Sequence, residues 1–133
     1  MTQLTIPRSK TPEYRRMYEN LVKAHDYRAL RDGTITRRKL EALQAIGYSL
    51  TNLGQRIGRT QQSMSDTFLG DEPIHWKTER AVARLYDELS NRPPEGIYAN
   101  RVRLRAQRLG YAPPASYDDI NDHTERPKGV VKA

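Results

Sequence analysis

The sequence predicts an all-α protein: a small helical bundle that contains a helix-turn-helix, with an extra N-terminal helix and a C-terminal helix followed by a loose tail. Apolar residues recur three and four positions apart in several segments, which is the spacing of one helix face. Capping residues or prolines stand where these segments begin, and glycines stand where most of them end. With 133 residues, of which 36% are hydrophobic, the chain suits one compact domain with a modest core.

The N-terminal part is expected to divide into a flexible arm over residues 1–11 and a helix with its turn over residues 12–35. Pro12 suits the first position of a helix. Apolar residues at helical spacing extend this helix over 12–31, and Gly33 follows where it should stop. The apolar stripe either packs on the domain's own core or forms a dimer contact.

The next helix is expected to begin with Thr36 as its cap and to end at Gly47. Leu40, Leu43 and Ile46 recur at three-residue spacing and form the ridge that this helix should bury.

The stretch 49–70 predicts two short helices joined by a tight turn, inside a helix-turn-helix domain over residues 36–92. Leu53 and Ile57 lie four apart on one face of the first helix. Gly58 follows them, where the residue that ends a helix often takes a positive φ.

The second of these helices should begin after Thr60, whose hydroxyl suits an N-cap. Met64 and Phe68 lie four apart and form its buried side, and Gly70 closes it. A slim, polar first turn is what a helix needs to enter the major groove of DNA.

A longer helix is expected over about 75–90, followed by a proline-rich linker. The segment 93–120 should hold a C-terminal helix, over 97–109, and a part that wraps back on the core through Tyr117 and Ile120. The remainder, 121–133, has no periodicity and is predicted to be disordered. The C-terminal helix carries arginines that either touch phosphates or form a solvated face: Arg101, Arg103, Arg105 and Arg108.

The formal net charge of +7 favours an acidic partner, and nucleic acid suits it better than a neutral metabolite. No small-molecule ligand, membrane partner or cofactor is expected. The chain has no cysteine, and its three histidines lack the spacing of a metal site. No apolar run approaches the roughly 20 residues of a membrane span. The expected location is the cytoplasm, with the nucleoid as the place of DNA binding.

The motif resembles the helix-turn-helix of Cro and phage repressors, with structural positions at Leu53, Gly54, Ile57, Gly58 and Met64. Gly54 replaces the usual alanine. Arg59 replaces a small apolar residue and is expected to swing out to solvent or phosphate. The segments TRRKLEALQAIGYS, AVARLYDELS and RLGYAPPASYDDI also resemble an actinobacterial and actinophage group of helix-turn-helix proteins.

This resemblance and the polarity of the second helix together nominate two sets of DNA contacts. Glutamine can pair with adenine in the major groove, and hydroxyls and arginines suit phosphate. Asp66 could accept from cytosine or hold Arg59 or Arg56. The candidate base-reading residues are Thr60, Gln61, Gln62, Ser63, Ser65 and Asp66, and the candidate phosphate contacts are Ser49, Thr51, Arg59, Arg37 and Arg38.

Catalysis is not expected. Asp118, Asp119 and Asp122 form a carboxylate cluster, but no histidine, nucleophile motif or glycine-rich phosphate loop accompanies it.

The sequence therefore predicts a sequence-specific, duplex-DNA-binding transcriptional regulator, as a repressor of a temperate phage or mobile element. The alternatives are a protein–protein adaptor such as an anti-repressor, and an architectural or recombination-accessory DNA-binding protein with little sequence preference. A homodimer through 12–31 or 97–109 is possible. The C-terminal end of the chain is either a degradation signal or a disordered terminus without a function.

Overall fold

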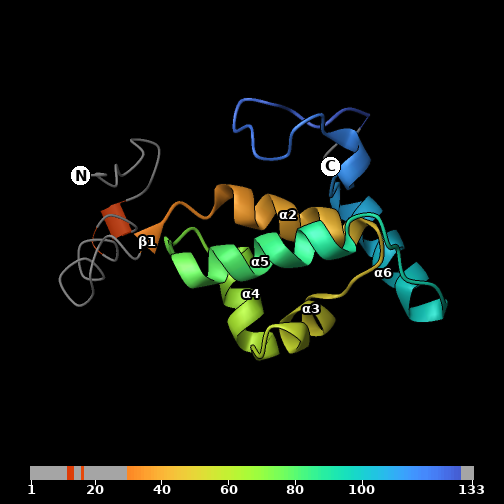
Figure 1. Ribbon diagram of the computed structural model, residues 1–133, viewed down its shortest axis with the longest axis horizontal. Coiled ribbons are helices and arrows are strands. Elements are labelled where there is room, and N and C mark those ends of the chain that lie inside the picture. The colour runs from red at the N-terminus through yellow and green to blue at the C-terminus, as the bar shows by residue number, and fades with distance from the viewer. Residues whose placement is uncertain (1–11, 14–15, 17–29, 130–133) are drawn as a thin grey trace.

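The computed structural model describes residues 12–13, 16 and 30–129, and these form a helical bundle (Figure 1). The fold class predicted from the sequence, all-α, is confirmed, since the strands among the described residues amount to one pair of two residues each. In chain order the elements are β1 (Leu30–Arg31), α2 (Thr34–Ala45), α3 (Leu50–Arg56), α4 (Gln61–Leu69), β2 (Ile74–His75), α5 (Trp76–Leu89), α6 (Ile97–Leu109) and the 3-10 turn η2 (Pro114–Ser116).

Helices α2 and α5 lie side by side along the long axis of the molecule, and α3 and α4 form a separate pair below them in Figure 1. Helix α6 packs against α2 near its C-terminal end. One core cluster joins α2, α3, α4 and α5, because each of these helices turns the apolar side of its 3.6-residue period inward. Its buried members are Leu40, Leu43, Tyr48, Leu53, Met64, Phe68, Val82, Leu85 and Leu89.

Helix α2 begins three residues earlier than the sequence predicted, since its N-cap is Gly33 and not Thr36. Gly33 occupies the N-cap position, and the Oδ1 atom of Asp32 accepts a hydrogen bond of 2.8 Å from the backbone N–H of Thr34. Thr36 is therefore a buried residue of the first turn and not the cap, so that prediction was wrong. The Asp32 carboxylate therefore accepts from the start of α2, where the sequence predicted the hydroxyl of Thr36 to do so.

The helix expected over 12–31 does not extend to its predicted end. Leu30 and Arg31 form β1, which pairs antiparallel with β2 so that Leu30 lies opposite His75. Leu30 and Ile74 are buried, and this tertiary burial overrides the helical spacing. Residues 12, 13 and 16 are helical, and the other residues of the predicted helix lie outside the described part.

The later helices match the predicted spans closely. Helix α5 starts at Trp76, after the Nδ1 atom of His75 accepts from the backbone N–H of Lys77. Helix α6 covers residues 97–109 as predicted and ends at Gly110, whose φ of +74° is left-handed. No described helix combines the length and apolar character that crossing a membrane requires.

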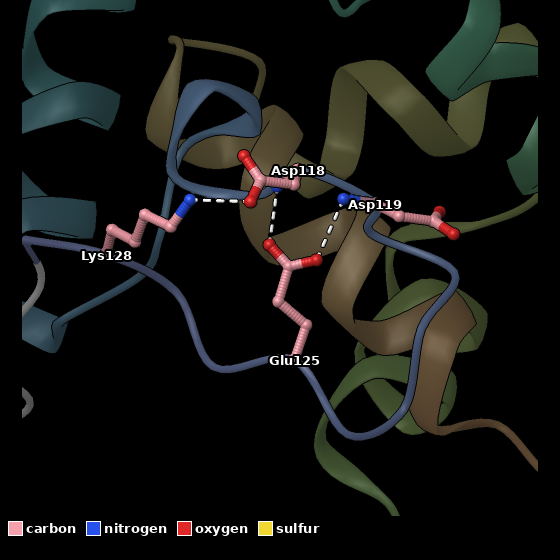
Figure 2. A network of polar contacts seen from close by, with 4 residues as sticks. All are labelled: Asp118, Asp119, Glu125 and Lys128. Carbon is pink, nitrogen blue, oxygen red and sulfur yellow. Dashed lines mark hydrogen bonds and ion pairs between the residues drawn. The ribbon is translucent and has the colours of Figure 1, made fainter.

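The segment after η2 folds back on α2, and for residues 121–129 this corrects the prediction of a disordered tail over 121–133. Glu125 accepts hydrogen bonds from the backbone N–H groups of Asp118 and Asp119, and Lys128 pairs with the Asp118 carboxylate at 2.6 Å (Figure 2). The Lys128 backbone N–H donates to the carbonyl of Ser116. Polar contacts to backbone groups hold this loop, so a search for apolar periodicity misses it; residues 130–133 lie outside the described part.

Candidate nucleic-acid interface

Helices α3 and α4 are joined by a turn of four residues, each helix with its own side-chain cap. The Ser49 hydroxyl accepts from the backbone N–H of Asn52, and the Thr60 hydroxyl accepts from that of Ser63, both at 3.1 Å. The carbonyl of Gly54 accepts from the N–H groups of Ile57 and Arg59. Capping serves the backbone groups that a helix start leaves unpaired, so both short helices have defined starts.

Gly54 is required by the close approach of the two helices. A Cβ atom at this position would lie 2.6 Å from the Cγ of Met64 and 3.0 Å from the carbonyl oxygen of Arg59. The turn also uses Gly58, whose φ is +72° as predicted. Glycine at position 54 therefore has a local cause, which is the lack of space between α3 and the start of α4.

Helix α4 buries Met64 and Phe68 in the core and exposes Gln61, Gln62 and Asp66. The Nε2 of Gln62 donates to the Oδ1 of Asp66 at 2.9 Å. The expectation that Asp66 holds Arg59 or Arg56 is therefore not met. Thr60, at the N-cap, is exposed as well. These four side chains form the accessible polar side of α4.

Ser63 and Ser65 lie on the flanks of α4 and are half-buried. The Ser63 Oγ accepts from the guanidinium of Arg59 at 3.3 Å. Ser65 lines a hollow between α4 and α6. Ser63 was nominated as a base reader, but it faces the α5 side of the helix and contacts Arg59.

Arg59 does not swing out to solvent or phosphate as expected. Its Nη2 donates to the Thr78 hydroxyl of α5 at 2.6 Å, and its Nη1 lies 3.3 Å from the Ser63 hydroxyl and 3.4 Å from that of Thr67. The side chain thus ties the α3–α4 turn to α5. A small apolar residue would fill this position by packing, whereas here the Arg59 guanidinium donates hydrogen bonds to three hydroxyl groups.

The two α2 arginines nominated for phosphate are also tied to the fold. Arg37 donates to the carbonyls of Thr67 and Glu72, at 2.8 and 2.5 Å, and so fixes the end of α4 and the loop after it. Arg38 donates to the carbonyls of Ile120, Asp122 and Glu125 and lies over the ring of Tyr117. Both arginines therefore cross-link elements of the free protein, and their nomination as phosphate contacts stays a prediction.

A hollow of about 210 Å³ brings α3, α4 and α6 together. Two nominated phosphate contacts and two nominated base readers line it, and their position beside α6 was not predicted from the sequence. Burial raises the pKa of the Tyr111 phenol in this hollow, with Glu41 adding to the effect and Arg105 opposing it, so Tyr111 remains a neutral hydroxyl at pH 7. The polar residues around the hollow are Gln44, Ser49, Thr51, Gln61, Ser65 and Arg105.

Helix α6 brings two arginines close to α3 and α4, a position that was not predicted from the sequence. Arg105 lines this hollow, and Arg101 lines a neighbouring one with Asn52 and Arg56 of α3. Arg103 behaves differently, because it donates to the carbonyls of Ile46 and Pro94 and so ties α6 to the end of α2. The spacing of the four arginines along the helix could have separated Arg103, because it lies nearest the side that carries buried Ala99 and Ala106.

The carboxylates considered for catalysis have local structural partners. Asp118 pairs with Lys128, Asp119 accepts from the backbone N–H of Asn121, and Asp122 accepts from the backbone and hydroxyl of Thr124. No group of histidine, aspartate and glutamate suited to a metal ion occurs among the residues that the structure describes.

Comparison of the chain with protein-family models, with curated proteins and with solved structures found no match.

Proposed function

We propose that this chain binds duplex DNA sequence-specifically through α4 and regulates transcription, as a repressor of a temperate phage or mobile element. The observation that carries this proposal is the accessible polar first turn of α4, with Thr60, Gln61 and Gln62 exposed, on a short helix held by a tight turn against α3. A recognition helix enters the major groove with its N-terminal residues against base edges, so slim polar side chains are needed there.

The contact between Gln62 and Asp66 favours reading by glutamine. A side-chain amide has two N–H donors, and Asp66 uses one of those on Nε2. The second N–H and the amide oxygen are left for the N7 and N6 of an adenine, which is the bidentate pair that glutamine makes. Asp66 then orients Gln62, and this replaces the cytosine contact considered for it.

The rigid support of α4 also favours base reading over loose association. Arg59 fixes the start of α4 to α5, and Arg37 fixes its end to the following loop. A helix held at both ends presents its side chains at a constant angle, and base readout depends on that geometry. Ser49 and Thr51 stay the nominated phosphate contacts of α3, on the edge of the α4 hollow.

Selection of bound sequences from a random duplex library tests the proposal. We expect a defined site that contains adenine, and we expect Gln62→Ala to lower its affinity by about ten- to a hundredfold, as for the loss of one bidentate pair. Gln107→Ala, which removes an exposed glutamine from α6, is the matched control and should leave the affinity unchanged. A selection that enriches no sequence, while duplexes bind, would replace this proposal by the architectural one.

The selected site also reports the oligomer. A two-fold dimer reads half-sites about 34–36 Å apart, whereas a monomer selects an asymmetric site. Protein that binds no duplex at moderate salt would instead favour the adaptor alternative.

A further inference from the structure

The outer side of α6 carries positive charge that the fold does not use. We propose that Arg101 and Arg105 bind backbone phosphates of the same duplex that α4 reads, so that α6 is a second DNA-contacting element. This inference rests on the proposed function of α4.

The position of α6 places these arginines beside the candidate site. Arg105 shares a hollow with Gln61 and Ser65 of α4, and Arg101 shares a second hollow with Asn52 of α3. Ser49 and Val102 line both hollows, so the two hollows adjoin each other between the start of α3 and the middle of α6. A duplex seated on the first turn of α4 would therefore have α6 at its flank.

The charges of this side lack the internal partners that the other arginines have. Arg105 makes no hydrogen bond or ion pair within the described part of the chain, and Arg101 contacts only the ring of Tyr98 there, at 6.0 Å. Helix α6 contains no acidic residue. A guanidinium with five unused donors in a fixed fork is suited to phosphate oxygens.

The spacing of the arginines suits one strand of the backbone. Arg101, Arg105 and Arg108 span seven positions, which is about 10 Å along a helix axis. Successive phosphates of one strand advance about 3.4 Å along the duplex, so the three arginines cover about three of them. Arg108 lies further from the two hollows and would be the outermost contact.

The apolar residues exposed on α6 do not make a second copy of the chain the better occupant. Ile97 and Leu104 are 64% and 58% exposed, and two α6 helices could in principle pair through them. Such a pair would set the exposed arginines of one copy against those of the other, with no acid on either helix to neutralise them. Charge complementarity therefore favours the phosphate backbone.

The salt dependence of duplex binding tests this inference. The variant R101Q/R105Q should reduce the slope of log K against log salt by about two units, because each phosphate contact contributes roughly 0.9. Its preferred bases should stay those of the unchanged protein, since phosphate contacts carry no sequence information directly. The control R84Q/R126Q removes the same charge from exposed positions on α5 and the C-terminal loop and should leave the slope within half a unit.

Equal slopes for the two double variants would overturn the role of α6 while the selected site and its dependence on Gln62 leave the function of α4 intact. If the unchanged protein binds no duplex, the proposed function and this inference are both wrong. Sedimentation of the free protein at low and high salt tests the other occupant, a second copy of the chain. If R101Q/R105Q strengthens a dimer and leaves the slope of log K against log salt unchanged, this side of α6 binds a second copy and not DNA.

Discussion

The arginines of α2 and of the α3–α4 turn differ from those on the outer side of α6 in what surrounds their guanidinium groups. Arg59 donates to Thr78 at 2.6 Å, and Arg38 donates to the Asp122 carbonyl at 2.7 Å and to two further carbonyls. Arg105 lines an open hollow without a hydrogen-bond or ion-pair partner among the described residues. Residues of one type therefore serve as cross-links in one region and as unused charge in the other.

We call Arg37, Arg38, Arg59 and Arg103 the inner arginines, and all of them except Arg59 donate to backbone carbonyls. The carbonyl of Thr67 is in the last turn of α4, and the Glu72 carbonyl is in the loop beyond it; Arg37 serves both. Arg103 serves the carbonyl of Ile46, at the end of α2. The last carbonyls of a helix have no partner within it, so a long planar donor fork can join a helix end to another element. Inner arginines should therefore matter to stability, and outer ones to binding.

The largest effect on stability is expected from Arg59. Arg59→Ala leaves the buried Thr78 hydroxyl without this donor and releases the turn from α5. We expect the free energy of unfolding to fall by about 2 kcal/mol, in the range for hydrogen bonds that involve a charged group. Urea unfolding measures it, and Arg105→Ala, an outer arginine, should stay within about 0.5 kcal/mol of the unchanged protein.

The same pair of variants can contradict the comparison. If Arg59→Ala unfolds at the same urea concentration as the unchanged protein but binds duplexes more weakly, Arg59 belongs with the phosphate contacts, as the sequence argument had it. If Arg105→Ala is the less stable of the two, α6 uses its arginine for packing.

A smaller and more local effect is expected from Arg38, which holds the segment after η2. Arg38→Ala removes the donor shared by the carbonyls of Ile120, Asp122 and Glu125. These groups lie near the surface and can turn to water, so we expect a loss of about 1 kcal/mol. Amide hydrogen exchange should accelerate over residues 118–128 and not in α5. Arg126→Ala, an exposed arginine in the same loop, is the control; faster exchange in the core of Arg38→Ala would show a global role instead.

The helices of this fold could be predicted because their apolar spacing and end residues act within a few positions of each other. Helix α6 and the glycine turn at Gly58 are examples, since each depends on a local pattern. The strand pair of Leu30 with His75 could not be predicted, because its partner lies 45 positions away and each strand has two residues. The start of α2 depended on the side chain of Asp32, one competitor among several possible caps.

The candidate site was predictable in part for the same reason. The exposure of Gln61 and Gln62 follows from the inward spacing of Met64 and Phe68 on one helix. The roles of Arg37, Arg38 and Arg59 depend on acceptors 4 to 87 positions away, and all but the nearest of these lie beyond the reach of a local pattern. Charge alone marks an arginine as a phosphate candidate, and only its tertiary acceptors distinguish a cross-link from a binding residue.

The smallest expected effect is the opening of the Asp122–Thr124 turn in the C-terminal loop at low pH. Hydrogen bonds from the hydroxyl and the backbone N–H of Thr124 lower the pKa of Asp122, and the charges of Arg38 and His123 act in the same direction. A carboxyl with a lowered pKa contributes stability above its unfolded pKa and loses it as the pH falls through the folded value. The Asp122–Thr124 turn should therefore stay closed at neutral pH, and it should open only at a pH lower than the roughly 3.9 at which an ordinary aspartate takes up its proton.

An NMR titration of the Asp122 carboxyl and the Thr124 amide measures this opening and also distinguishes the two influences. Because the Thr124 hydroxyl is the largest cause of the lowered pKa, Thr124→Val should return more of the shift than Arg38→Ala does. The side-chain contacts of Arg38 go to carbonyls, and its charge reaches the Asp122 carboxylate only across solvent, which screens it. A titration in which Arg38→Ala returns the larger part would place Arg38 in direct contact with that carboxylate, and the inner arginines would then act as ion pairs and not as backbone cross-links.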